Sequence, residues 1–199
     1  MVDSACAEHI FSRYAEWTPM YQIPMRPPSK ARRAAAMAAL AAMLAAAPSR
    51  GDDLLQPVDQ VDRIVIEKAL RKLTLVKNDQ PVRSYRVALG AQPTGHKRRE
   101  GDARTPEGVY EIDARNPRSD FFLSLRISYP NEADVARARA AGEDPGGQIM
   151  IHGLRNGFGW LGDRHQRRDW TDGCVAVTNS EMLEIWRLVD LGTPVEIRP

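Results

Sequence analysis

The chain has 199 residues, with 28 Lys and Arg, 26 Asp and Glu, and two cysteines. This length is sufficient for one domain with a well-filled core. Residues 1–47 hold five of the basic and three of the acidic residues, so the chain from Pro48 onward has 23 of each. Without a basic excess, the sequence does not predict binding to nucleic acid or to an anionic membrane. No Cys/His cluster has metal-ligand spacing, so we expect no metal and no other cofactor.

A signal for export is predicted near the N-terminus. From Met25, a basic stretch leads to 14 apolar residues, Ala34–Ala47, and then to a small and polar exit. This order is typical of a secretory signal peptide, and the apolar run is shorter than the ~20 residues of a stable membrane span. An alanine-rich soluble helix is the alternative, but the run lacks a polar face. We therefore expect a signal peptide at 25–47 and a periplasmic mature protein.

The remaining boundaries follow from that prediction. Residues 1–24 are expected to be an upstream extension or a long basic region, and the polar residues 48–58 a linker. The domain itself is expected at 59–199. Cleavage near Ala47 would remove Cys6 and leave Cys174 as the one thiol of the mature protein. An odd cysteine in an exported chain is a candidate reactive group.

The first part of the domain predicts an antiparallel sheet. Val61–Lys68, Arg71–Lys77 and Val82–Leu89 alternate apolar and polar residues, as half-buried strands do. Asn78-Asp79 separates the second run from the third and predicts a hairpin turn. Further strands are expected at 109–112, 125–129, 148–152, 174–178 and 194–198.

Two helices have N-terminal capping signals. Asn131, with Asp134 at the third helical position, predicts a helix over Glu132–Ala141 that stops at Gly142. Thr178 and Glu181 form a second capping box ahead of a final helix. The apolar residues of that helix keep the spacing that buries one face; they are Met182, Ile185, Trp186 and Val189.

A histidine and a cysteine stand at the ends of two strand-like runs. His152 ends the run Gln148–His152, and Cys174 begins a run in which Val175 and Val177 face the core. Cys174 then shares the opposite face with Ala176, a small residue that leaves space. A neutral imidazole beside a thiol can take its proton and produce a nucleophilic thiolate. Each residue alone is more often structural, since lone cysteines are commonly buried hydrophobes. His96 and His165 lie in charged loops and are expected to be solvated.

These residues carry a family resemblance. The arrangement H-G, then T-x-G-C followed by an apolar run, resembles the YkuD-type L,D-transpeptidase catalytic domain, and the segment 169–179 resembles its periplasmic Gram-negative branch. Supporting pieces are Gly95, Gly101-Asp102, Thr105–Tyr110 and Ile127–Asn131. The resemblance covers about residues 60–198. It implies a mainly β fold, a barrel-like mixed β-sheet with short flanking helices.

The resemblance also implies a reaction. Cys174 would be the nucleophile and His152 the general base. The thiolate would attack a peptidoglycan stem tetrapeptide at the carbonyl of its diamino acid, release D-alanine and form a thioester. An amine of another stem, or a lipoprotein lysine, would then accept the acyl group.

Other residues are assigned supporting roles. The backbone around Gly173 and Cys174 would stabilise the oxyanion, with Thr171 and Gly153 as further backbone support. Substrate binding is expected of Arg168, Trp170 and Tyr129. Arg155, Arg164 and Arg167 could hold stem carboxylates or be solvated. Two departures from the family pattern bear on specificity, since Asp172 stands where a histidine is frequent and Ala176 where a polar residue is frequent.

Two alternative functions stay open at this stage. With water as the acceptor, the same site would make an L,D-carboxypeptidase or an amidase that releases protein from the wall. A protein of another class would be a catalytically silent wall-binding domain. The Cys174/His152 pair argues against that last alternative, because a binding module needs neither residue.

Overall fold

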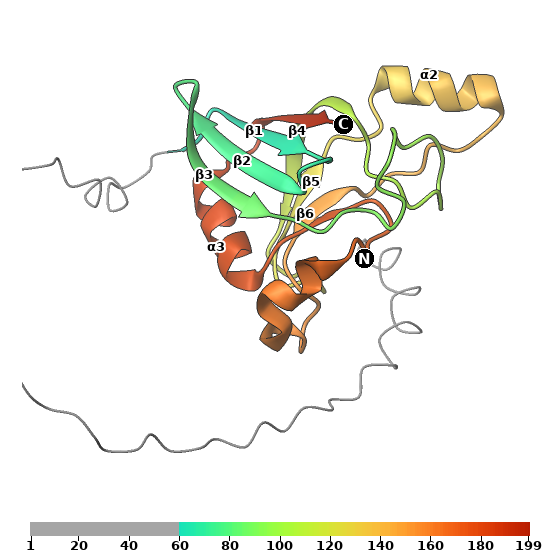
Figure 1. Ribbon diagram of the computed structural model, residues 1–199. Coiled ribbons are helices and arrows are strands. Elements are labelled where there is room, and N and C mark those ends of the chain that lie inside the picture. Colours follow the sequence, from blue (N-terminus) through green and yellow to red (C-terminus); the bar gives the residue numbers. More distant parts are fainter. Residues whose placement is uncertain (1–59) are drawn as a thin grey trace, which may run out of the picture. The chain divides into compact units, whose positions relative to one another are not determined.

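The computed structural model describes residues 60–199 (Figure 1). The predicted extension at 1–24, signal peptide at 25–47 and linker at 48–58, together with Cys6, lie outside the described residues. Within residues 60–199, no helix has the length and apolar character needed to cross a membrane.

One mixed sheet of eight strands dominates the described region, in the order β3-β2-β1-β8-β4-β5-β6-β7. Three short helical segments accompany it. The strands are β1 (Arg63–Glu67), β2 (Lys72–Lys77), β3 (Gln80–Arg86), β4 (Gly108–Asn116), β5 (Ser124–Ile127), β6 (Met150–His152), β7 (Val175–Ala176) and β8 (Pro194–Arg198). The helices are α2 (Glu132–Ala141), the 3₁₀ segment η3 (Gly159–Arg167) and α3 (Asn179–Leu188).

The two ends of the strand order are joined, which gives the sheet its barrel-like curvature. After β3 the chain continues to Ala88, which exchanges two backbone hydrogen bonds with Ala176 of β7 at 2.8 and 2.9 Å. Gly90 then bridges to Thr171. The pairs β1–β8 and β6–β7 are parallel and the other neighbours are antiparallel. The predicted mainly β, barrel-like mixed sheet is therefore confirmed.

The core lies on one face of this sheet and is covered by α3 (Figure 1). Alternate residues of the strands point into it, among them Ile64, Ile66, Leu73 and Leu75. The predicted face of α3 packs against them through Met182, Ile185 and Val189, all fully buried. Both predicted capping boxes are present, at Asn131 and at Thr178.

The structure differs from the sequence prediction in the segment between β6 and β7. Expected to be a charged loop, it contains η3, the orange coil at the lower edge of the coloured ribbon in Figure 1. Gly162 breaks η3 with φ 47° and ψ −137°, a conformation that favours glycine. The strand β4 is also longer than the predicted 109–112, because its second half pairs with β5 after a bulge.

Candidate active site

The parallel pair β6–β7 brings His152 and Cys174 to one face of the sheet. His152 pairs with Ala176, and the amide of Val177 donates to the His152 carbonyl at 3.0 Å. Cys174 lies two residues before Ala176, and residues two apart in an extended segment face the same side. The other face carries Ile151 and Val175, which belong to the core. Both candidate catalytic side chains are only 2% exposed.

The imidazole of His152 is oriented by the next peptide unit. Its Nδ1 lies 2.6 Å from the Gly153 carbonyl oxygen. Because a carbonyl oxygen can only accept, Nδ1 carries the proton in the neutral ring, and the lone pair is at Nε2. A histidine in this tautomer can act as a general base through Nε2.

Gly153 itself is required by its surroundings. A Cβ at this position would lie 2.7 Å from Oδ1 of Asn179 and 3.2 Å from the Phe121 carbonyl oxygen. The same Asn179 oxygen accepts the amide of Leu154 at 2.8 Å. Asn179, the first residue of α3, therefore fixes the backbone that follows His152.

Thr171 organises the turn before the cysteine. It is fully buried, its hydroxyl donates to the Cys174 carbonyl at 2.7 Å, and the hydroxyl oxygen accepts the amide of Gly173 at 3.2 Å. The Cys174 thiol itself donates to the Gln148 carbonyl at 3.5 Å. An oxyanion could use the Gly173 amide only by replacing the threonine hydroxyl.

Gly173 occupies a position that no other residue fits. Its φ is +135°, which L side chains rarely adopt. A Cβ would lie 2.6 Å from the Arg104 carbonyl oxygen and 3.0 Å from Cδ1 of Ile149. The turn that presents Cys174 is therefore pressed against the loop that contains Arg104.

Aromatic rings surround the imidazole. The rings of Phe121 and His152 have centroids 4.7 Å apart, and the indole of Trp170 meets His152 edge-on at 5.9 Å. Phe121 and Trp170 also stack on each other at 6.4 Å. Trp170, predicted to bind substrate, is thus a direct neighbour of the candidate base.

His165 differs from the sequence expectation. We expected a solvated loop residue, but the side chain is only 4% exposed and Trp170 Nε1 donates to its Nδ1 at 3.4 Å. Burial, together with the nearby His152, lowers the pKa of His165 to about 4, while Asp163 acts in the opposite direction. The sequence carries no signal for this burial, because His165 lies in a run of charged and polar residues, 163–169.

The other predicted substrate-binding residues are dispersed. Arg168 is exposed just after η3, as are Arg164 and Arg167 within it, whereas Arg155 is half-buried. Tyr129 is 5% exposed and its hydroxyl donates to the Pro145 carbonyl at 3.0 Å. The ring of Tyr129 contacts those of Tyr110 and His96, on the side of α2. Substrate binding by Tyr129 remains a prediction from the sequence.

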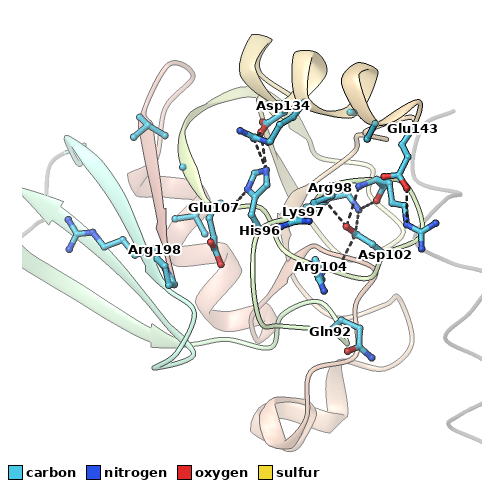
Figure 2. Close-up of a pocket in the computed structure, with 18 of the residues that line it drawn as sticks. Gln92, His96, Lys97, Arg98, Asp102, Arg104, Glu107, Asp134, Glu143 and Arg198 are labelled. Carbon is cyan, nitrogen blue, oxygen red and sulfur yellow. Dashed lines mark hydrogen bonds and ion pairs between the residues drawn. The ribbon is translucent and has the colours of Figure 1, made fainter.

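A separate groove lies between α2, the loop 92–108 and the end of β8 (Figure 2). Its volume is about 1410 Å³ and its walls are strongly charged. On the α2 side, the buried carboxylate of Asp134 accepts from Tyr110 Oη at 3.0 Å, lies 3.0 Å from Nε2 of His96, and pairs with Arg137. Nδ1 of His96 accepts the amide of Glu107 at 2.9 Å. His96, expected to be solvated, is therefore part of this network.

Buried lysines hold the loop side of the groove. Lys97 is 3% exposed and donates to Asp102 at 2.8 Å, while Asp102 also accepts the amide of Arg104 at 3.1 Å (Figure 2). Lys68 is 2% exposed and donates to Glu107 at 2.7 Å and to the Thr105 carbonyl at 2.9 Å. These pairs fix the loop whose Arg104 carbonyl supports Gly173.

Among residues 60–199, no group of three or more His, Cys, Asp and Glu side chains could hold a metal ion. The groups available at the end of β6 and the start of β7 are a buried thiol and an oriented imidazole on one face of the sheet. Such a pair is suited to nucleophilic attack on a carbonyl and transfer of the acyl group.

Comparison with known proteins gives the same fold and a family. The curated putative L,D-transpeptidase YafK of Escherichia coli K12 is 31% identical over 108 residues, 53% of this chain and 36% of YafK. Among solved structures, the helical cell shape determining protein Pgp2 from Campylobacter jejuni superimposes with a TM-score of 0.54 at 23% identity, over 70% of this chain and 48% of Pgp2. The chain thus spans about a third of YafK and half of Pgp2. The family model for YkuD, the L,D-transpeptidase catalytic domain, matches residues 61–197. The chain therefore belongs to the YkuD family of L,D-transpeptidase catalytic domains.

Proposed function

We propose that this protein is an exported peptidoglycan L,D-transpeptidase with Cys174 as nucleophile and His152 as general base. One observation carries the proposal: the β6–β7 register turns both side chains to one face. The Gly153 carbonyl, which sets the imidazole tautomer, supports the role of His152. Membership of a family that acts on peptidoglycan stem peptides supports the substrate class.

The reaction begins with proton transfer from Cys174 Sγ to His152 Nε2. The thiolate attacks the carbonyl of the diamino acid in a stem tetrapeptide, and the new C–S bond gives a tetrahedral oxyanion. Collapse of this intermediate breaks the peptide bond. The imidazolium returns its proton to the departing amine of D-alanine, and a thioester remains.

The second half repeats these steps with an acceptor. An amine approaches the thioester, His152 takes its proton, and the thiol is regenerated. The acceptor is a stem amine or a lipoprotein lysine; with water in its place, the product is a shortened stem and the protein is a hydrolase. The buried, ring-lined surroundings of His152 favour transfer, because they limit the access of water to the thioester.

The backbone of the turn supplies the oxyanion contact. The Gly173 amide is bonded to Thr171 Oγ1, so the amide of Cys174 is the simpler donor. A backbone donor aimed at the developing charge is worth about 3 kcal/mol in an acyl-transfer site. Trp170 and Arg168 are proposed to contact the stem peptide, Trp170 through its position beside His152.

Product analysis tests the reaction. The protein is incubated with disaccharide-tetrapeptide, and the products are separated and weighed by mass spectrometry. Dimers joined through two diamino acids would indicate transfer, and tripeptide alone would indicate hydrolysis. Unchanged tetrapeptide, identical to a parallel incubation with Cys174→Ala, would contradict both and leave wall binding as the function.

The role of His152 has its own test. His152→Ala should slow alkylation of Cys174 by iodoacetamide near neutral pH, because the base that deprotonates the thiol is lost. Trp160→Ala, which removes an exposed ring of η3 and leaves the rings around His152 in place, is the control. Equal alkylation rates in His152→Ala and the parent would remove His152 from the role of base.

Export is a proposal from the sequence at 25–47 alone. Its test is N-terminal sequencing of the protein recovered from the periplasmic fraction of a Gram-negative host. We expect a start close to Pro48. Recovery of the intact N-terminus from the cytoplasm would contradict it.

A further inference from the structure

His165 is buried in a segment that is otherwise largely exposed. Its neighbours Arg164 and Arg167 in η3 are exposed, while His165 is 4% exposed. The side chain therefore turns inward, toward Trp170 and the strand ends, and away from the solvent that would hydrate an imidazole. Burial of a polar ring costs free energy unless a contact offsets it.

The contact with Trp170 defines the state of the His165 ring. An indole N–H can only donate, so His165 Nδ1, 3.4 Å away, accepts and carries a lone pair. In the neutral ring the proton is then on Nε2. Within residues 60–199, Nε2 has no hydrogen-bond partner. A leucine at this position would avoid that buried donor, so stability alone does not explain a histidine.

The indole held by His165 lies against the candidate base. Trp170 meets the His165 ring at 79° and a centroid distance of 6.2 Å, and meets the His152 ring at 71° and 5.9 Å. Phe121 packs on both Trp170 and His152. Rotation of the indole would therefore remove one wall of the space in which the His152 imidazole is held.

We propose that His165 is a positioning residue for His152: its neutral imidazole accepts the Trp170 N–H and thereby fixes the indole against the base. The inference deepens the proposed function and rests on it. His165 touches neither substrate nor nucleophile in this account. It acts by restricting the orientation of His152, which must point Nε2 at the thiol and later at the leaving amine.

Two substitutions separate the acceptor from the bulk of the ring. His165→Asn retains an oxygen acceptor close to the position of Nδ1, whereas His165→Leu removes it. His165→Leu should keep or raise the melting temperature and lower kcat for D-alanine release about tenfold, because a poorly oriented base reacts more slowly. KM should be unchanged, and His165→Asn should recover most of kcat. Equal kcat in His165→Leu and the parent would overturn the proposal, as would equal loss in both variants.

Trp170→Phe provides a second route if His165→Leu fails to fold. It keeps a ring at the position and removes the N–H, so it should lower kcat to the same extent. The double variant Trp170→Phe/His165→Leu should lose no more than either single variant, because both act through one contact. Additive losses would contradict the proposal.

Two readouts need no peptidoglycan and so separate this inference from the proposed function. The indole N–H resonance of Trp170, assigned through Trp170→Phe, should move in His165→Leu and stay close to the parent position in His165→Asn. Alkylation of Cys174 should slow in His165→Leu alone. If the parent releases no D-alanine, the proposed function fails, and these two readouts still decide whether His165 positions the pair.

Discussion

The site at the end of β6 and the start of β7 and the groove beside α2 are stabilised by different kinds of interaction. At the strand ends, His152 is held by a backbone carbonyl and by rings, and its face of the sheet is nearly sealed from water. In the groove, Lys97, Asp102 and Asp134 are held by opposite charges and charged hydrogen bonds. The difference indicates that the groove network is a support. It fixes the loop that presses on Gly173, while the end of β6 and the start of β7 hold the two residues proposed to react.

Gly173→Ala should have the largest effect, because the two regions meet there. The new Cβ would lie 2.6 Å from the Arg104 carbonyl oxygen at a φ of +135°. We expect a loss of about 3 kcal/mol of stability from strain and overpacking, and a loss of Cys174 alkylation of about 10²-fold from displacement of the turn. Denaturant titration and alkylation kinetics measure the two effects.

Gly192→Ala is the matched control for this change. Its φ is +80° and nothing lies within 4 Å of the added Cβ. It should cost about 1 kcal/mol of stability and leave alkylation unchanged. If Gly173→Ala behaves in the same way, the loop does not support the turn.

Lys68→Met should lower the free energy of unfolding more than it lowers the alkylation rate of Cys174. The substitution leaves the Glu107 carboxylate and two carbonyl oxygens without their buried donor. Breaking a buried pair in this way costs about 3 kcal/mol. Lys72→Met is the control, since its pair with Glu67 is far more exposed and is worth less than about 1 kcal/mol. Chemical denaturation measures the unfolding free energy of both variants. Equal losses in Lys68→Met and Lys72→Met would refute a supporting role for the buried pair.

The two regions should also respond to acid in different pH windows. The folded pKa of His165 is about 4 against an ordinary value of 6.5. Between these values the unfolded chain binds a proton that the folded chain does not, so stability falls as the pH drops, by about 2 kcal/mol at pH 5. Burial raises the pKa of Asp102, but the backbone amides of Arg98 and Arg104, together with Lys97, outweigh it and hold the pKa below the ordinary range. The Asp102 contribution is therefore lost only at lower pH.

Comparison of the parent with His165→Asn isolates the part of the pH dependence that is due to His165. The variant should lack the fall in unfolding free energy between pH 6.5 and pH 5, while both proteins lose stability below pH 4. Parallel curves over the whole range would show that His165 is not buried in its neutral form.

Trp160→Ala should have the smallest effect. Trp160 lies in η3 with 71% of its surface exposed, whereas Trp170 is packed between two histidines. We expect a change of less than about 0.5 kcal/mol in unfolding free energy. A thermal melt shifted as far as that of Trp170→Ala would show that position relative to His152 does not distinguish the two rings.

Local patterns predicted much of this structure. The β2–β3 hairpin, the capping boxes at Asn131 and Thr178, and the side of the sheet on which Cys174 lies all follow from residues close in sequence. Alternation and capping are encoded locally, which is why these elements were predictable.

Long-range packing accounts for what the sequence did not reveal. His165 is buried because Trp170 and the strand ends surround it, and its charged neighbours in η3 gave the opposite expectation. The hydrogen-bond acceptors of the buried Lys68 ammonium group lie 27 to 39 residues further along the sequence. The first half of β4 pairs with β8, which lies at the C-terminal end of the chain. No pattern within a short window contains such information.

The central claim is that Cys174 forms the acyl-enzyme, and intact-protein mass spectrometry tests it most directly. The full chain is mixed with disaccharide-tetrapeptide and quenched in acid at early times. We predict an added mass equal to the disaccharide-tripeptide acyl group, mapped by proteolysis to Cys174 and absent in Cys174→Ala. An unmodified protein that nevertheless releases D-alanine, or an adduct that persists in Cys174→Ala, would contradict the account.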